Sequence, residues 1–76
     1  MNEALLRRSR ARRGFRPALA KAVRLEARVT LAEIGHELRV TEGTVSRWES
    51  GARTPRGPVA ERYVALLARL EGELRR

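Results

Sequence analysis

Apolar residues recur every three or four positions along most of this 76-residue chain, which is the spacing of helices with one buried face. The first such segment follows Pro17, a favourable first residue for a helix. Its apolar positions at helical spacing are Leu19, Val23 and Val29. We expect a helix over residues 17–28. Because no segment alternates apolar and polar residues with a period of two, the sequence predicts an all-α fold.

A second helix is expected over residues 31–38. Thr30 precedes it and Glu33 follows three residues later, the spacing of a capping box in which each side chain satisfies a backbone N–H of the other residue. Gly35 lies in the middle of this helix, where glycine costs roughly 1 kcal/mol relative to alanine. We interpret Gly35 as the small residue that lets the next helix cross closely.

A third helix is expected over residues 42–50, after a connection of only three residues. Thr41 supplies its N-terminal cap, and Gly51 suits the left-handed conformation that ends a helix. Val45 and Trp48 are its only large apolar residues, so we expect them to dock this helix on the domain. Two short helices joined in this way form a helix-turn-helix pattern.

The last helix follows the segment ARTPRGP, which is a loop by its Pro and Gly content, and it begins at Pro58. One face carries Val59, Tyr63, Leu66, Leu67, Leu70 and Leu74. In so small a domain we expect residues 59–67 to cover the core, which leaves Leu70 and Leu74 for a partner. The predicted architecture is a small all-α bundle of four to five helices.

The net charge indicates a polyanionic partner. Seventeen basic residues against nine acidic ones give a formal charge of +8. All the basic residues except Lys21 are arginines, whose planar guanidinium can donate two hydrogen bonds to one phosphate. Nucleic acid is the simplest such partner, and an anionic membrane surface is the competing one.

We divide the chain into a basic N-terminal arm, residues 1–16, and a folded domain, residues 17–76. Between residues 2 and 14, the large apolar residues are Leu5 and Leu6, which are too few to build a core or a membrane-binding face. We expect a flexible basic segment, helical in part. Three of its basic residues are candidates for the DNA minor groove, although each one taken alone is more often a solvated charge: Arg12, Arg13 and Arg16.

Missing residue types narrow the function. The chain has no Cys, which excludes disulfides, thiol nucleophiles and Cys-rich zinc sites, and it has one His, His36. We therefore expect no metal, no cofactor, no small-molecule substrate and no enzymatic activity. No apolar run approaches the ~18 residues of a membrane span, and no apolar segment of a secretory signal follows the Arg cluster. We expect a cytoplasmic protein without membrane association.

The stretch TLAEIGHELRVTEGTVSRWESG resembles the Cro/C1-type helix-turn-helix family, also called the XRE family. The matching residues are Thr30, Glu33, Ile34, Leu38, Val40, Thr41, Thr44, Val45, Ser46, Trp48, Glu49 and Gly51. With the flanking helices the resemblance covers about residues 17–70. It implies a bundle of lambda-repressor-like type, in which helix 42–50 enters the major groove of DNA and helix 31–38 lies across the backbone.

The resemblance also implies an ion pair between Arg24 in the first helix and Glu49 near the end of the third, which would hold the helices in register. Two unrelated surface charges are the alternative.

The sequence departs from the family at three positions. Gly35 stands where relatives usually have Ala, Arg39 stands where the turn usually has Gly, and Leu31 replaces a Gln that binds phosphate in relatives. The contact of that Gln would fall to Thr30 or to backbone N–H groups at the helix start.

By match to the family, four residues of helix 42–50 lie nearest the base edges: Glu42, Gly43, Thr44 and Arg47. Arg47 suits a bidentate bond to guanine, and Glu42 either accepts from cytosine N4 or is an acid favoured by the helix dipole. Thr44 can donate to a phosphate or place its methyl group against thymine. Gly43 has no side chain and permits close approach.

Contacts to the DNA backbone are expected from polar residues at the helix starts, on helix 42–50 and in the loop after it. These residues are Thr30, Thr41, Ser46, Arg53, Thr54 and Arg56.

The leading functional hypothesis is a sequence-specific, double-stranded-DNA-binding transcriptional regulator, a small Cro-like repressor of a phage or bacterium. The family resemblance implies a homodimer, at least on operator DNA, in the bacterial cytoplasm or nucleoid. The first alternative is an antitoxin-type autoregulator that binds a protein partner. The second is an architectural or RNA-binding protein that depends on the basic arm alone.

Overall fold

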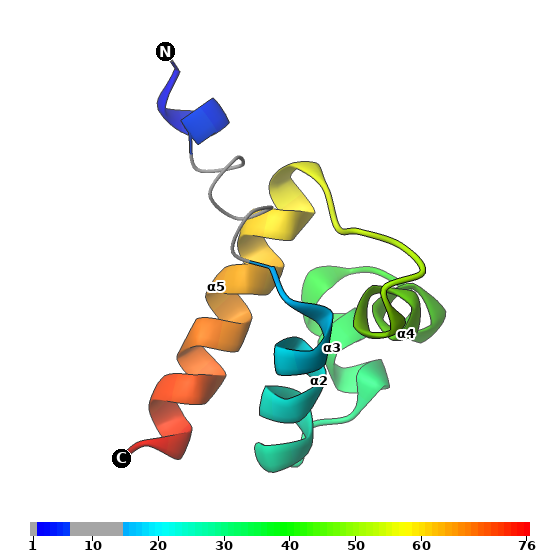
Figure 1. Ribbon diagram of the computed structural model, residues 1–76, viewed down its shortest axis with the longest axis vertical. Coiled ribbons are helices and arrows are strands. Elements are labelled where there is room, and N and C mark those ends of the chain that lie inside the picture. The colour runs from blue at the N-terminus through cyan, green and yellow to red at the C-terminus, as the bar shows by residue number, and fades with distance from the viewer. Residues whose placement is uncertain (1, 7–14) are drawn as a thin grey trace.

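The computed structural model describes residues 2–6 and 15–76 of the chain. Its helices are α2 (Pro17–Glu26), α3 (Leu31–Leu38), α4 (Glu42–Ser50) and α5 (Gly57–Leu74) (Figure 1). Residues 3–6 form a further helical turn, and the described residues contain no strand. The predicted all-α bundle with a helix-turn-helix is therefore confirmed, and both helices of that motif begin and end where the sequence predicts.

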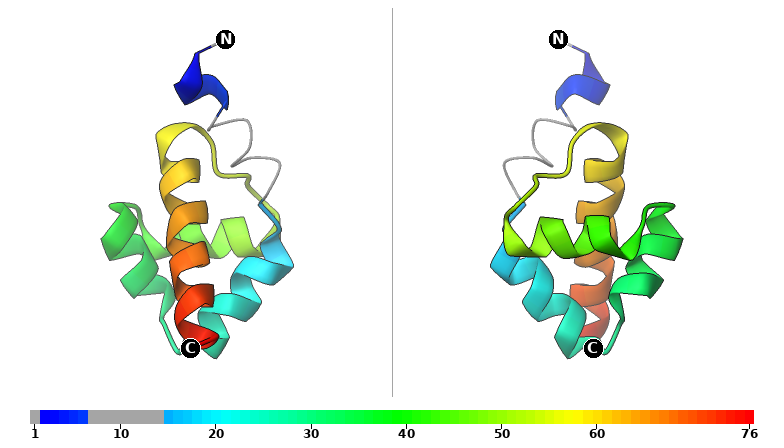
Figure 2. Two further views of the ribbon diagram at one scale, coloured as in Figure 1. Left: turned by 90° about the vertical axis from the view of Figure 1, so that its left-hand side faces the viewer. Right: turned by 90° about the vertical axis from the view of Figure 1, so that its right-hand side faces the viewer.

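The bundle places α4 and α5 on opposite faces. Figure 2 shows it from two opposite sides, with α5 nearest the viewer in one view and α4 nearest in the other. Both α2 and α3 pack against α4 and against α5. The side chains of α4 and α5 meet inside the bundle, where the rings of Trp48 and Tyr63 lie with their centroids 4.8 Å apart. The outer face of α4 is thus free of the other helices.

The core is a single cluster of buried side chains contributed by all four helices. Its members are Ala20, Ile34, Leu38, Val45, Trp48 and Tyr63. Tyr63 lies between two other aromatic rings, since its centroid is also 5.4 Å from that of Phe15. Val45 and Trp48 are 0% and 3% exposed, so the two large apolar residues of α4 dock this helix as predicted.

The crossing of α3 and α4 depends on Gly35, as its place in the sequence predicts. A Cβ atom at Gly35 would lie 2.7 Å from the carbonyl oxygen of Val40, closer than two such atoms approach. The turn that follows α3 passes through Arg39, which adopts the left-handed conformation (φ 59°, ψ 44°) where relatives usually have glycine. The backbone thus keeps the geometry of the turn although a non-glycine residue occupies it.

The predicted first helix is two residues too long. α2 ends at Glu26 because Arg28 adopts a left-handed conformation, with φ 58°, and turns the chain toward α3. Leu19 is 49% exposed although it lies at helical spacing with the buried Val23. Leu19 instead lines a shallow apolar hollow between α2 and α5, together with Phe15.

α5 begins at Gly57, one residue before the predicted start, and runs to Leu74. Tyr63 is buried, and Leu66, Leu67 and Leu70 are partly buried against the core. Leu70 is therefore partly covered by the bundle, whereas Leu74 is 37% exposed. The apolar packing extends further along α5 than we expected, and the use of either leucine by a partner stays a prediction.

Candidate nucleic-acid interface

The start of α4 is fixed by a pair of threonines. The hydroxyl of Thr41 accepts the backbone N–H of Thr44 at 3.1 Å, and the two hydroxyl oxygens lie 2.9 Å apart. This cap satisfies one of the N–H groups that the first helical turn leaves without an intrahelical partner. The hydroxyl of Thr44 keeps further hydrogen-bonding capacity beside this contact, so both its hydroxyl and its methyl group are available for an external contact.

The end of α4 is fixed by a left-handed glycine. Gly51, with φ 82°, donates its N–H to the carbonyl of Trp48, as the sequence predicts for this position. The carbonyl of Arg47 accepts from the N–H of Arg53 at 3.2 Å and from the hydroxyl of Ser50 at 3.1 Å. These bonds turn the chain back beside α4, which brings the loop of residues 51–56 next to this helix.

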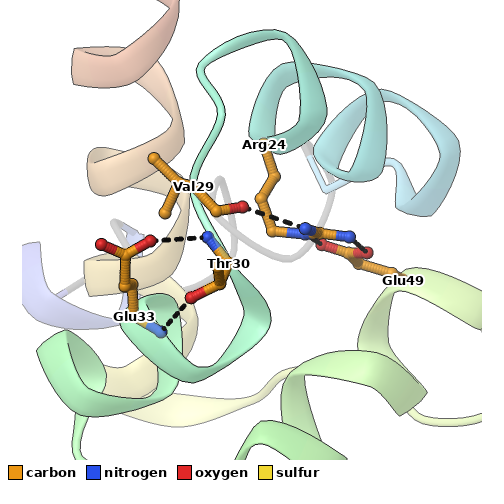
Figure 3. Close-up of polar contacts among 5 residues, drawn as sticks. All are labelled: Arg24, Val29, Thr30, Glu33 and Glu49. Carbon is orange, nitrogen blue, oxygen red and sulfur yellow. Dashed lines mark hydrogen bonds and ion pairs between the residues drawn. The ribbon is translucent and has the colours of Figure 1, made fainter.

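Arg24 and Glu49 connect α2 to α4 (Figure 3). The guanidinium donates from Nε to Oε2 at 2.6 Å and from Nη2 to Oε1 at 3.0 Å, a bidentate ion pair whose side chains are only 10% and 6% exposed. Nη1 donates to the carbonyl of Val29 at 3.0 Å. The hydrogen bonds to Glu49 raise the pKa of Arg24, against the opposing effect of burial. One guanidinium therefore holds α2, the connection to α3 and α4 together.

The start of α3 carries the predicted capping box (Figure 3). The hydroxyl of Thr30 accepts the N–H of Glu33 at 3.0 Å, and the carboxylate of Glu33 accepts the N–H of Thr30 at 2.8 Å. The bond from the Thr30 backbone, helped by the Thr30 hydroxyl, lowers the pKa of Glu33. The cap fixes the entry into α3 directly after the carbonyl that Arg24 binds.

With both ends capped and one side buried, α4 exposes a polar face. Glu42, Ser46 and Arg47 are exposed on it, and Gly43 and Thr44 are partly buried. The right-hand view of Figure 2 shows α4 lying across the front of the molecule. The structure therefore brings the four predicted base-contacting residues together within residues 42–47 of α4.

A groove runs beside α4 and gathers the residues predicted to bind phosphate after it. It is lined by Val40, Thr44, Trp48, Ala52, Arg53, Thr54, Pro55, Arg56 and Val59, with a volume of about 660 Å³. Arg53, Thr54 and Arg56 are exposed, whereas Pro55 is buried. The basic residues of this loop are predictable from the sequence, but the apolar lining is not, because the spacing of Val40 and Val59 along the chain does not reveal that they share a groove.

The remaining residues predicted to contact DNA do not gather at one place. Thr30 and Thr41 are exposed, but both hydroxyls already cap helices. Arg16 is exposed directly before α2 and lines the hollow that also contains Leu19. Arg12 and Arg13 lie outside the residues that the structure describes.

Together, the closely crossed helices α3 and α4, the short turn between them and the exposed polar face of the second helix define a helix-turn-helix DNA-binding domain. The family model described as "Helix-turn-helix" matches residues 21–73, which is well over half of the chain. The chain belongs to the Cro/C1-type, or XRE, helix-turn-helix family, whose members bind double-stranded DNA and regulate transcription.

Comparisons with curated proteins and with solved structures give no match. Within the described part of the chain, no helix has both the length and the apolar character needed to cross a membrane.

Proposed function

We propose that this DNA-binding regulator is a sequence-specific repressor of phage or bacterial type, which occludes a promoter or operator and performs no catalytic step. The observation that carries the proposal is α4 itself. Its two ends are capped, its inner side is anchored by Val45 and Trp48, and the Arg24–Glu49 pair fixes it to α2. Such a rigidly held helix can present its outer face to the major groove without reorganisation.

Base recognition is assigned to Glu42, Thr44 and Arg47, with Gly43 between them. Among the described residues, the exposed guanidinium of Arg47 has no hydrogen-bond or ion-pair partner, so its donors remain for guanine O6 and N7. Thr44 can place its methyl group against thymine, or its hydroxyl can bind a phosphate in addition to its contact with Thr41. Glu42 accepts from cytosine N4 or acts only on the helix dipole.

Phosphate binding is assigned to both sides of α4. Arg53, Thr54 and Arg56 flank the groove beside its second half, and their contacts would set the position of the protein on DNA without selecting a sequence. Thr30, Thr41 and Ser46 lie at the helix starts and on α4. We further propose that residues 1–16 form an arm with Arg12, Arg13 and Arg16 in the minor groove, and that residues 17–76 are the domain that positions it.

The proposal includes a homodimer on paired half-sites, in the bacterial cytoplasm or nucleoid. Leu74 at the end of α5 and Leu25 near the end of α2 are 37% and 55% exposed, so apolar surface remains at the end of the bundle for a second copy. The antitoxin-type alternative uses α4 in the same way and adds a protein partner.

Selection from a random-sequence duplex library, followed by footprinting, tests this function. The full chain and a variant lacking residues 1–14 are compared at one salt concentration. We expect both to enrich the same motif, with the shortened chain binding more weakly, and we expect two protected half-sites related by symmetry. Failure to enrich any motif would contradict sequence-specific recognition, loss of all binding without the arm would assign binding to the arm, and a single half-site would contradict the dimer.

A further inference from the structure

Gly43 and Arg47 lie one above the other on the exposed face of α4. Residues four apart share a helix face, and long side chains on a helix lean toward its N-terminus. The guanidinium of Arg47 accordingly lies over Gly43. A Cβ atom at Gly43 would be 3.6 Å from Nη1, 3.7 Å from Nη2 and 3.9 Å from Cζ of Arg47. The space that a side chain at position 43 would use is therefore bordered by the group that we assign to base recognition.

We infer that Gly43 is a specificity-determining residue that acts through Arg47. The bare backbone at position 43 provides the space in which the guanidinium of Arg47 rests, on the first turn of α4. This inference rests on the proposed function, in which Arg47 contacts bases. It assigns a role to Gly43 that is more than close approach to DNA: the glycine sets where the donors of Arg47 are held.

Hydrogen bonds and ion pairs do not fix the position of Arg47. The side chain is exposed, and it makes no such bond within residues 2–6 and 15–76. Its guanidinium lies where the nearest atom would be 3.6 Å from a Cβ atom at position 43. The rotamer that places it there is open because Gly43 has no side chain, and a side chain longer than alanine would exclude that rotamer.

Among the described residues, three glycines lie in the interior of helices, and they differ in how much room they have. At Gly35 in α3 a Cβ atom would meet a backbone oxygen at 2.7 Å, so no side chain fits without movement of the helices. At Gly72 in α5 a Cβ atom would have no neighbour within 4 Å. Gly43 is the intermediate case, since its Cβ atom would make ordinary contact with Arg47, and only atoms beyond Cβ would take the place of the guanidinium. Alanine should therefore be tolerated at position 43, and leucine should displace Arg47.

The competing explanation is that Gly43 only lets the DNA come close. The two explanations differ in whether residue 47 matters. If leucine at position 43 acts by displacing Arg47, it has no further effect once Arg47 is removed. If it acts by a direct clash with DNA, it weakens binding whether or not Arg47 is present.

The test is a double-mutant cycle of Gly43→Leu and Arg47→Ala, with Gly43→Ala as the tolerated change. The probes are the best duplex selected by the wild-type protein and the same duplex with each base pair changed in turn. Gly72→Leu is the matched control, because it adds the same side chain to an exposed helical glycine away from α4. The helix content and Tm of every variant are measured first, and Gly43→Ala and Gly43→Leu should fold at least as stably as the wild type.

We expect Gly43→Ala and Gly72→Leu to discriminate among the duplexes within about 2-fold of the wild type. Gly43→Leu should lose discrimination by about 5-fold or more at the same base pairs as Arg47→Ala, the range of one bidentate contact. In the Arg47→Ala background, Gly43→Leu should reduce discrimination by less than a further factor of about 2. If Gly43→Leu reduces discrimination in the Arg47→Ala background as much as it does in the wild type, the inference is overturned. It is also overturned if Gly43→Leu alone leaves discrimination unchanged.

A second measurement needs no DNA. In the free protein, nuclear Overhauser effects should connect the side-chain protons of Arg47 with the Hα protons of Gly43. Their absence would overturn the inference even if the base assignment is right. If Arg47→Ala alone leaves every base preference unchanged, the proposed role of Arg47 fails and the specificity role of Gly43 fails with it. If Arg47→Ala loses base discrimination and Gly43→Leu keeps it, the role of Gly43 is refuted and the role of Arg47 stands.

Discussion

Tyr63 and Arg24 are both buried polar residues, but only Arg24 has its hydrogen-bonding groups paired. Arg24 donates to the carboxylate of Glu49 and to the carbonyl of Val29. The hydroxyl of Tyr63, in a residue only 1% exposed, makes no hydrogen bond within the described part of the chain. Burial, and secondarily the charge of Glu49, raises the pKa of Tyr63 well above its ordinary value, so the phenol stays neutral. Removing the hydroxyl of Tyr63 should therefore raise the stability of the domain, whereas removing the partner of Arg24 should lower it.

Tyr63→Phe should stabilise the domain. It removes a hydroxyl that is buried without a partner and keeps the ring between Phe15 and Trp48. We expect the free energy of unfolding to rise by about 1 kcal/mol, measured by urea denaturation. A loss of stability of similar size would show that the hydroxyl has a partner in solution.

Glu49→Ala should destabilise the domain strongly, because it leaves the guanidinium of Arg24 buried without its counter-charge. The expected cost is about 3–5 kcal/mol, a large part of the total stability of so small a domain. Glu71→Ala is the matched control, since its pair with Arg75 is 2.9 Å long but has side chains 37% and 76% exposed. That change should cost under about 1 kcal/mol. Equal costs in thermal or urea unfolding would contradict a structural role for the Arg24–Glu49 pair.

At the scale of the helices, the ends of α3 and α4 could be predicted from the sequence and the end of α2 could not. Thr30 with Glu33, and Thr41 with Gly51, are residue types with a strong preference for helix ends, so they mark boundaries by themselves. Arg28 ends α2 in a left-handed conformation that an arginine does not signal. Local residue preferences therefore predicted the helix-turn-helix better than the element before it.

The capping box of α3 makes a pH-dependent contribution to the stability of the folded protein, and Glu33→Gln should remove this pH dependence. The pKa of Glu33 is lowered in the folded protein, so its contribution to stability is present above the ordinary glutamate value of about 4.3 and is lost as the pH falls through the lower folded value. Unfolding measured at pH 7 and at pH 3 should show a smaller loss of stability in acid for the variant than for the wild type. Identical acid losses would show that the carboxylate does not cap α3 in solution.

At the scale of the whole molecule, the grooves and exposed faces depend on how the helices pack, which cannot be read from the sequence. The family resemblance implied that α4 faces DNA and that Arg24 pairs with Glu49, and the structure contains that ion pair. The resemblance did not reveal that Leu19 lies in a hollow beside α5, that Leu70 packs on the core, or that Val40 and Val59 share a groove with Arg53. Each of these depends on how helices distant in the sequence lie against one another.

The arrangement also places three arginines on different surfaces. Arg47 is exposed on α4, and Arg53 lines the groove beside it. Arg69 belongs to α5, the helix on the opposite face of the bundle from α4 (Figure 2). On our account Arg47 discriminates between DNA sequences, and Arg53 adds affinity for any duplex. Arg69 makes no direct contact with DNA, so it contributes neither to discrimination nor to affinity.

Titration of Arg47→Ala, Arg53→Ala and Arg69→Ala with the selected duplex and with a scrambled duplex of equal length, at fixed salt, tests this account most directly. Arg47→Ala should reduce the ratio of the two affinities by about 5- to 100-fold, the range of one base contact. Arg53→Ala should weaken both complexes alike and lower the salt dependence by about one phosphate contact. Arg69→Ala should resemble the wild type. Equal losses of both affinities for Arg47→Ala and Arg53→Ala would contradict base recognition by α4.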